Sequence, residues 1–123
     1  MWILTLLYWG AICVATHMPH VPADTPQVND KVMHFMAYGL LTGLFFLSLW
    51  TLGVRPRLSV LLTLLIVLVY GVIDERTQPY FGRTCDLIDW LADAAGTTVS
   101  LLAMSLLRWL ASRWAAPAPA PAS

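Results

Sequence analysis

The sequence predicts an all-α fold, a polytopic integral membrane bundle of four transmembrane helices. Of its 123 residues, 59% are hydrophobic and only 11% are charged, whereas an ordinary soluble domain carries about 25% charged residues. The apolar residues fall into four long runs, and a helix needs roughly 20 mostly apolar residues to cross a bilayer. The formal net charge is zero, so the composition gives no electrostatic basis for binding nucleic acid.

The first apolar run, from Met1 to about His17, predicts an uncleaved spanning helix that is slightly short. A signal peptide would carry a basic amino-terminal region, which this run lacks. The segment from His17 to Asn29 contains three prolines and predicts a loop, because proline removes backbone donors. Asn29 or Asp30 can cap the second helix by accepting from its free backbone amides.

The second and third helices are predicted over residues 30–52 and 58–75, joined by a short turn. The third is uncharged until it reaches Asp74 and Glu75. Pro79 predicts that this helix ends before Gln78, because the residue preceding a proline is disfavoured in the helical conformation.

One face of the second helix carries polar groups near its start. Lys31, His34 and Tyr38 have the spacing that places side chains on one side of a helix. Gly39 and Gly43, four residues apart, allow a neighbouring helix to approach closely.

Residues 74–96 hold most of the polar chemistry of the chain. The fourth helix is predicted to begin at Asp86 or Asp89 and to run to about Trp109 or beyond, since a carboxylate in the first turn satisfies open amides. Beyond it, the alternating alanine and proline of residues 115–123 predict a disordered tail. The charged side chains of the stretch are Asp74, Glu75, Arg76, Arg83, Asp86, Asp89 and Asp93.

The distribution of arginine predicts the orientation of the bundle. With four spans, both termini and the turn at residues 53–57 lie on one side, and positive residues prefer the cytoplasm. We therefore expect a multi-pass protein of the cytoplasmic (inner) membrane with cytoplasmic termini. The loops at 17–30 and 75–88 would lie outside. The arginines on the cytoplasmic side are Arg55, Arg57, Arg108 and Arg113.

The charged stretch is expected at the membrane boundary, close to Lys31 and His34. A charge at the bilayer centre costs about 2.5–3.5 kcal/mol on the insertion scale, so a cluster of seven belongs at the interface. Asp93 lies about 6 Å deeper than Asp89 along a helix, and an acid there needs a cationic partner or a proton.

These polar positions resemble the VanZ-like family, which is named for a protein associated with resistance to the glycopeptide teicoplanin. The resemblance implies a four-helix membrane domain over residues 1–114. It covers roughly residues 30–105, with Thr77 where the family often has histidine and Phe81 where it often has proline. It rests on Asp30-Lys31-x-x-His34-Phe35-x-x-Tyr38-Gly39-Leu40-Leu41, on Asp74-Glu75-x-x-Gln78, and on Gly82-Arg83-x-x-Asp86-x-x-Asp89-Trp90-Leu91-Ala92-Asp93-x-x-Gly96.

Each candidate residue has a functional and a structural interpretation. The planar fork of Arg83 suits a phosphate or carboxylate ligand, or it forms a salt bridge to Asp86, Asp89 or Asp74 that pins the loop. His34 is the candidate general base, or it makes an interfacial hydrogen bond. A divalent cation could bind the acids, but no metal signature supports one, and no metal or cofactor is expected. The ligand-binding candidates are Lys31, His34, Asp74, Glu75, Gln78, Arg83, Asp86, Asp89 and Asp93.

Three functions fit these observations. The first is a protein that binds or modulates a cell-envelope component, such as an anionic lipid or a lipid-linked wall precursor, or the response to a glycopeptide. The second, less favoured, is a membrane enzyme acting on a lipid phosphate or wall precursor. The third is a structural or assembly subunit. A pocket among the polar groups would favour the first two, and a closed set of mutual pairs would favour the third. Beyond the lipid bilayer, the sequence names no partner and no oligomeric state.

Overall fold

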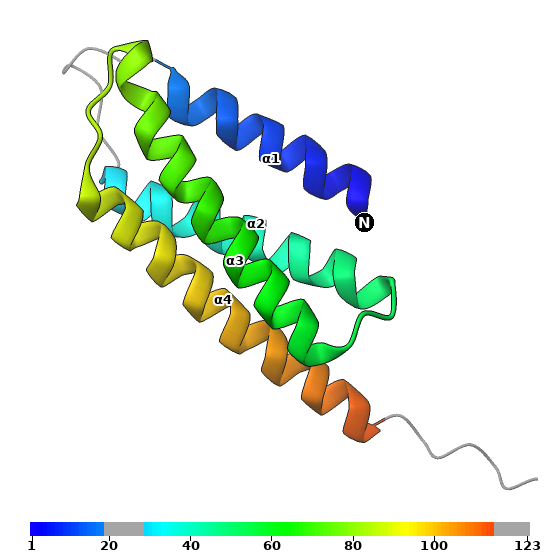
Figure 1. The fold of residues 1–123 in the computed structure, drawn as a ribbon. Coiled ribbons are helices and arrows are strands. Elements are labelled where there is room, and N and C mark those ends of the chain that lie inside the picture. Colours follow the sequence, from blue (N-terminus) through cyan, green and yellow to red (C-terminus); the bar gives the residue numbers. More distant parts are fainter. Residues whose placement is uncertain (19–28, 115–123) are drawn as a thin grey trace, which may run out of the picture.

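The computed structural model describes residues 1–18 and 29–114 and shows an all-α fold (Figure 1). No strand occurs in these two ranges, which confirms the predicted fold class. The loop and the tail predicted within residues 19–28 and 115–123 lie outside the described residues. The elements are α1 (Trp2–His17), α2 (Asp30–Thr51), α3 (Pro56–Thr77), the 3-10 turn η1 (Gln78–Phe81) and α4 (Leu87–Trp114).

Three of the helices are long and apolar enough to cross a membrane. They are α2 with 22 residues, α3 together with η1 with 26 residues, and α4 with 28 residues, and they indicate a membrane protein. Helix α1 has 16 residues, or about 24 Å of helix, against a hydrocarbon core of about 30 Å. A fourth span formed by α1 therefore stays a prediction.

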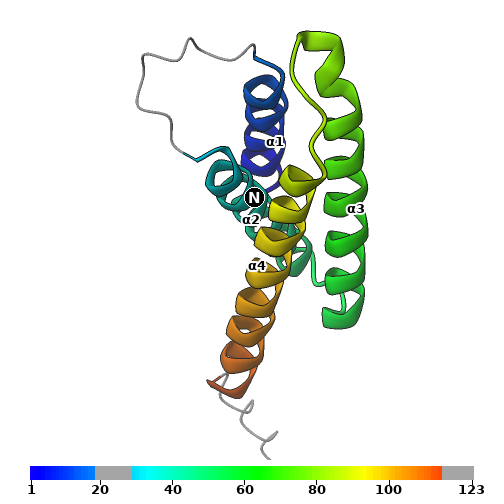
Figure 2. The same cartoon turned by 90° about the vertical axis from the view of Figure 1, so that its left-hand side faces the viewer.

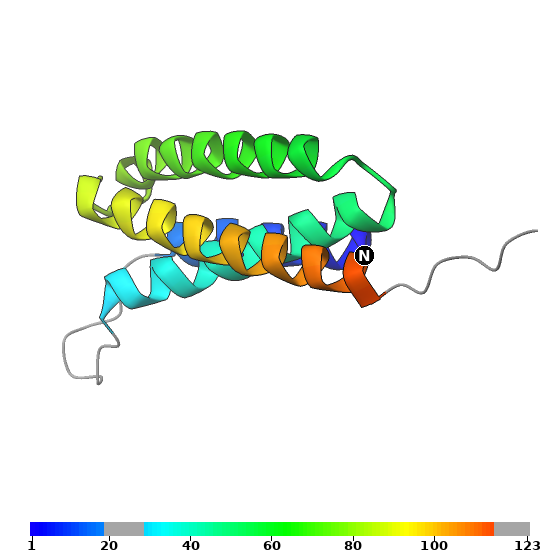
Figure 3. The ribbon, with the colours of Figure 1, turned by 90° about the horizontal axis from the view of Figure 1, so that it is seen from below.

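The helices are arranged with α4 against α2 and α3. Helix α1 packs on α2 and α3 and, within the described residues, does not contact α4 (Figure 2). Seen from below, α3 and α4 run side by side (Figure 3). Helices α2 and α4 both begin at the end of the bundle where α1 and α3 finish, so all four helices contribute residues to that end.

The closest helix contact is between α2 and α4. Gly96 lies directly against the backbone of Phe35, with no room for a side chain. A Cβ at Gly39 would lie 3.4 Å from the Gly96 carbonyl oxygen, and one at Gly43 would lie 3.4 Å from Ser100 Oγ. The small residues therefore serve packing, as their spacing predicts.

Helix α1 is attached to the bundle by buried polar and aromatic contacts. Thr5 is fully buried, and its Oγ1 lies 2.9 Å from Ser48 Oγ and 3.2 Å from the Leu44 carbonyl oxygen. The ring of Trp9 meets that of Tyr70 edge-on at 5.1 Å between centroids. These contacts hold the first turn of α1 against α2 and its middle against α3.

Helix α3 is longer than its sequence predicts at both ends. It starts at Pro56, where proline is tolerated because the first helical N–H needs no partner. It continues to Thr77, and the 3-10 turn then accommodates Pro79. Gly82 ends that turn with φ +77°, a left-handed conformation that glycine adopts at little cost. The α-helix ends before Gln78, as the position of Pro79 predicts, and Pro79 lies in the first turn of η1.

Candidate functional site

Polar side chains from all four helices and from the loop before α4 gather at one end of the bundle, and all the acids of the described residues lie there. We call this group the polar cluster. The acids of the polar cluster form two groups. Each outer acid pairs with a lysine or an arginine. The inner acids have no such partner among the described residues. The outer acids are Asp30, Asp86 and Asp89, and the inner acids are Asp74, Glu75 and Asp93.

Lys31 is held between two outer acids of the α4 start. Its Nζ lies 3.0 Å from Asp86 Oδ2 and 2.6 Å from Asp89 Oδ1. Asp86 also caps α4, because its Oδ1 accepts from the backbone N–H of Ile88 at 2.9 Å. That N–H and then the Lys31 ammonium hold the pKa of the Asp86 carboxyl below its ordinary value. The start of α2 is capped in turn by Asn29, which accepts from the Lys31 backbone N–H.

Arg83 pairs with Asp30 and not with any of the acids proposed for it from the sequence. Its Nη2 lies 3.3 Å from Asp30 Oδ2, because the loop before α4 turns toward the start of α2. The Arg83 side chain is only 10% exposed, and its Nε has no hydrogen-bond partner among residues 1–18 and 29–114. A cavity of about 90 Å³ adjoins it, lined also by Thr16, Asp30 and His34. This is room for roughly three water molecules.

His34 and Asp93 form a buried pair that joins α2 to α4. The imidazole Nδ1 donates to Asp93 Oδ1 at 2.9 Å, and the two residues are 4% and 1% exposed. Asp93 Oδ2 has no hydrogen-bond partner. Tyr38 stacks on His34 with 6.3 Å between ring centroids, so the spacing of the polar face of α2 does bring these side chains together.

The two acids at the end of α3 accept hydrogen bonds from neutral groups. Asp74 accepts from Thr16 Oγ1 at 2.8 Å and from Gln78 Nε2 at 3.3 Å. Glu75 accepts from Gln78 Nε2 at 3.2 Å and from the Asp86 backbone N–H at 3.0 Å. Gln78 therefore joins both carboxylates, while its own Oε1 has no partner.

The sequence analysis missed two residues of α1 that belong to the polar cluster. Thr16 bonds to Asp74, and His17 Nε2 lies 2.8 Å from Thr77 Oγ1. An imidazole from α1 therefore lies beside the position at which the VanZ-like pattern often carries histidine. The sequence could have predicted this contact. In a four-span bundle, the first and third helices end on the same side of the membrane, so Thr16 and His17 lie at the same membrane boundary as Asp74.

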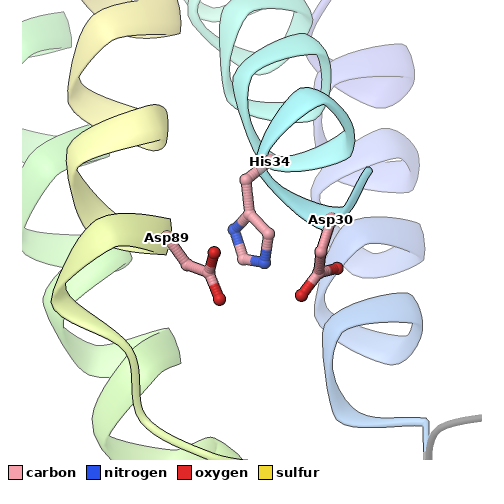
Figure 4. Close-up of side chains that lie close together, drawn as sticks. All are labelled: Asp30, His34 and Asp89. Atoms are coloured by element: carbon pink, nitrogen blue, oxygen red, sulfur yellow. The ribbon is translucent and has the colours of Figure 1, made fainter. Parts of the chain in front are cut away.

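Two groups of residues place three potential metal ligands close together. Asp30, His34 and Asp89 point toward one another (Figure 4). His34 also belongs to a second group with Glu75 and Asp93, all three of which are buried. Within each group, the three ligand atoms lie within 4.8 Å of one another.

Comparison with known proteins agrees with this geometry. The profile of the family described as VanZ/LLP1 matches residues 4–108. The chain belongs to the VanZ/LLP1 family. This confirms the resemblance inferred from the polar positions, and it extends the match to most of α1, the helix that supplies Thr16 and His17.

The chain is also similar to an uncharacterized protein of Schizosaccharomyces pombe. It is 32% identical over 93 residues, which are 74% of this chain and 56% of the relative. The chain thus spans a little over half the length of the relative it matches. No solved structure matches the chain.

Proposed function

We propose that this VanZ/LLP1 protein binds an anionic cell-envelope component, the headgroup of a lipid or of a lipid-linked wall precursor, at the polar cluster. Arg83 carries the proposal. Its side chain is nine-tenths buried, one of its N–H groups has no partner in the part of the chain that the structure describes, and it lines a small cavity with Thr16 and His34. A buried arginine with an unmet donor stabilises an anion through charge-assisted hydrogen bonds.

The two cations of the polar cluster have different roles in this proposal. Lys31 is already shared by Asp86 and Asp89, so it organises the start of α4. With the described residues, Arg83 makes one ion pair, the 3.3 Å contact to Asp30, and its planar fork can donate to a phosphate without losing that contact. The cavity beside it is the size of one small tetrahedral group, not of a whole precursor, so the rest of the ligand would lie in the lipid.

The proposed site faces the outer surface of the cytoplasmic membrane. The end of the bundle opposite the polar cluster carries the arginines that the positive-inside rule assigns to the cytoplasm. There Arg108 donates to the Val54 carbonyl oxygen at 2.8 Å and lies over the ring of Trp50. A protein that holds an envelope lipid at the outer surface would also change the response to a glycopeptide that acts there.

The test is lipid binding by purified full-length protein in neutral detergent, with labelled phosphatidylglycerol as the anionic probe and phosphatidylcholine as the neutral one. A lipid-linked wall precursor then competes with the bound probe. Arg83→Ala is expected to weaken binding of the anionic probe by about 10- to 100-fold, since hydrogen bonds to a charged group contribute about 1.5–3 kcal/mol.

The matched control is Arg76→Ala, because Arg76 lies near the same end of the bundle but is exposed. It should leave binding within about twofold of the native protein. Unchanged binding by Arg83→Ala, with helicity and melting temperature intact, would refute the proposal.

A structural role is the second candidate, and the closed pairs of the cluster favour it. Lys31 with two acids and His34 with Asp93 each tie α2 to α4. Arg83→Lys separates the two candidates. A role limited to pairing with Asp30 should tolerate lysine, whereas headgroup binding through the planar fork should not.

A further inference from the structure

We propose that the inner part of the polar cluster binds one divalent transition-metal ion, with His34, Glu75 and Asp93 as ligands. This inference goes beyond the proposed function, because it concerns a cation held between α2, α3 and α4 rather than an anion at Arg83. It rests on the distribution of charge, on the position of the ligand atoms and on buried oxygens that lack partners.

The distribution of charge leaves the inner acids without a cation. Lys31 and Arg83 are within ion-pair distance of the outer acids only. Within residues 1–18 and 29–114, the inner acids have no lysine or arginine partner, and only histidine contacts Asp74 or Asp93 as a potential cation. Each inner acid is at most 4% exposed. Buried carboxylates without compensation are costly, and one divalent ion would offset two of them.

The ligand atoms are already arranged around a common point. One ring nitrogen of His34 and one oxygen each of Glu75 and Asp93 lie within 4.8 Å of one another. Metal–ligand bonds of about 2.0–2.2 Å in a tetrahedral site place two ligand atoms about 3.3–3.6 Å apart. The three ligand atoms would therefore approach one another by up to about 1.5 Å when the ion binds. They come from three different helices, so the ion would also link those helices.

Unpartnered oxygens supply an observation that does not depend on this spacing. Asp93 is 1% exposed, and its Oδ2 accepts no hydrogen bond from any described residue. Gln78 is fully buried, and its Oε1 is unpartnered while its amide nitrogen donates to Glu75. The hydroxyl of Tyr38 is likewise buried without a partner. Buried oxygens normally find a partner, and a cation, bound directly or through its water, would provide one.

The group drawn in Figure 4 is the weaker candidate for this ion. Asp30 and Asp89 converge on His34 from α2 and α4, but each is already neutralised. Asp30 pairs with Arg83, and Asp89 with Lys31. A second cation placed there would face two fixed positive charges at close range.

The donor set indicates the class of metal. One imidazole nitrogen and two carboxylate oxygens suit a borderline ion such as Zn²⁺ or Mn²⁺, whereas Ca²⁺ prefers six to eight oxygens. Binding through Nδ1 would replace the proton that His34 now shares with Asp93. A cationic ring would release its Nδ1 proton to solvent and keep the one on Nε2, whereas a neutral ring would bind the ion as the tautomer with its proton on Nε2.

The experiment titrates full-length protein in detergent with the metal alone. Isothermal titration calorimetry follows Zn²⁺, and loss of the free-ion paramagnetic resonance signal follows Mn²⁺. We expect one ion per chain. Glu75→Gln and Asp93→Asn should each weaken binding at least tenfold. Asp86→Asn is the matched control, because it removes an outer carboxylate but keeps a helix-capping side chain, and it should change the affinity less than twofold.

A variant with a different ligand atom distinguishes loss of a metal ligand from loss of folding. Asp93→Cys offers a thiolate, which Zn²⁺ accepts and Mn²⁺ does not favour. It should retain Zn²⁺ binding and lose Mn²⁺ binding by at least tenfold. The proposal is overturned if the native chain binds no stoichiometric ion, or if folded Asp93→Cys binds Zn²⁺ no better than Asp93→Asn. It is also overturned if Asp30→Asn and Asp89→Asn abolish binding while Glu75→Gln does not.

Discussion

Replacing Gly96 with alanine tests whether the α2–α4 contact holds the polar cluster together. A Cβ at this position would overlap the carbonyl oxygen of Phe35, and it would lie 3.0 Å from the carbonyl carbon and 3.1 Å from Cα of the same residue. All three are backbone atoms, which cannot rotate aside as a side chain would. The two helices must therefore separate.

The size of the effect follows from these distances. Ordinary contact begins near 3.4 Å, so α2 must move by about 0.4 Å for the carbon atom and farther for the oxygen. Overpacking of this kind costs about 1–3 kcal/mol. His34 precedes Phe35, and Asp93 lies one turn before Gly96, so their 2.9 Å hydrogen bond lies next to the strained contact. We expect a loss of about 2 kcal/mol in the free energy of unfolding.

The assay is equilibrium unfolding of the purified protein in detergent, followed by helical circular dichroism. Gly10→Ala is the matched control, because nothing lies within 4 Å of a Cβ there. It should be neutral or slightly stabilising, since alanine favours helix over glycine. Gly39→Ala, with its nearest neighbour at 3.4 Å, should fall between the two. Equal stability of Gly96→Ala and Gly10→Ala would refute this account of the packing.

Two further predictions concern the cap of α4 and the attachment of α1. The pKa of Asp86 is lowered in the folded protein, so its ionised form stabilises the fold. This contribution is complete at pH values above the ordinary carboxyl pKa of about 4, and it is lost as the pH falls through the lower pKa of the folded state. The melting-temperature difference between native protein and Asp86→Asn should shrink between pH 6 and pH 3, and a constant difference would contradict this. Thr5→Val removes the buried bond to Ser48 and should cost about 1 kcal/mol of unfolding free energy. Thr98→Val, at an exposed site that bonds only within its own helix, should cost less, and equal costs would contradict the buried role.

The sequence predicts the helices well because each one depends on local chemistry. Four apolar runs interrupted by proline and charge predict four helices, and the observed starts of α2 and α4 follow from the capping side chains of Asn29 and Asp86. The end of α3 before Gln78 follows from Pro79, whereas the 3-10 turn that comes next was not predicted, because proline is tolerated in the first turn of such a helix.

The pairing inside the polar cluster could be predicted only in part. Spacing places Lys31 and His34 on one face of α2, but it does not fix how far α2 is shifted along α4. That shift decides that Lys31 meets Asp86 and Asp89 while His34 reaches Asp93. Arg83 pairs with Asp30 because of the path that the loop before α4 takes. No local sequence pattern predicts that path.

The order of the pairs along the chain has a consequence for biogenesis. Three contacts join Asp74 to Thr16, Arg83 to Asp30, and Asp93 to His34. In each pair, the second partner named is synthesised before the first. A nascent chain released before α4 would leave the imidazole of α2 without Asp93, and the ammonium beside it without Asp86 and Asp89. Such a fragment should be retained by the insertion machinery or degraded, and only emergence of the final helix would release the finished bundle.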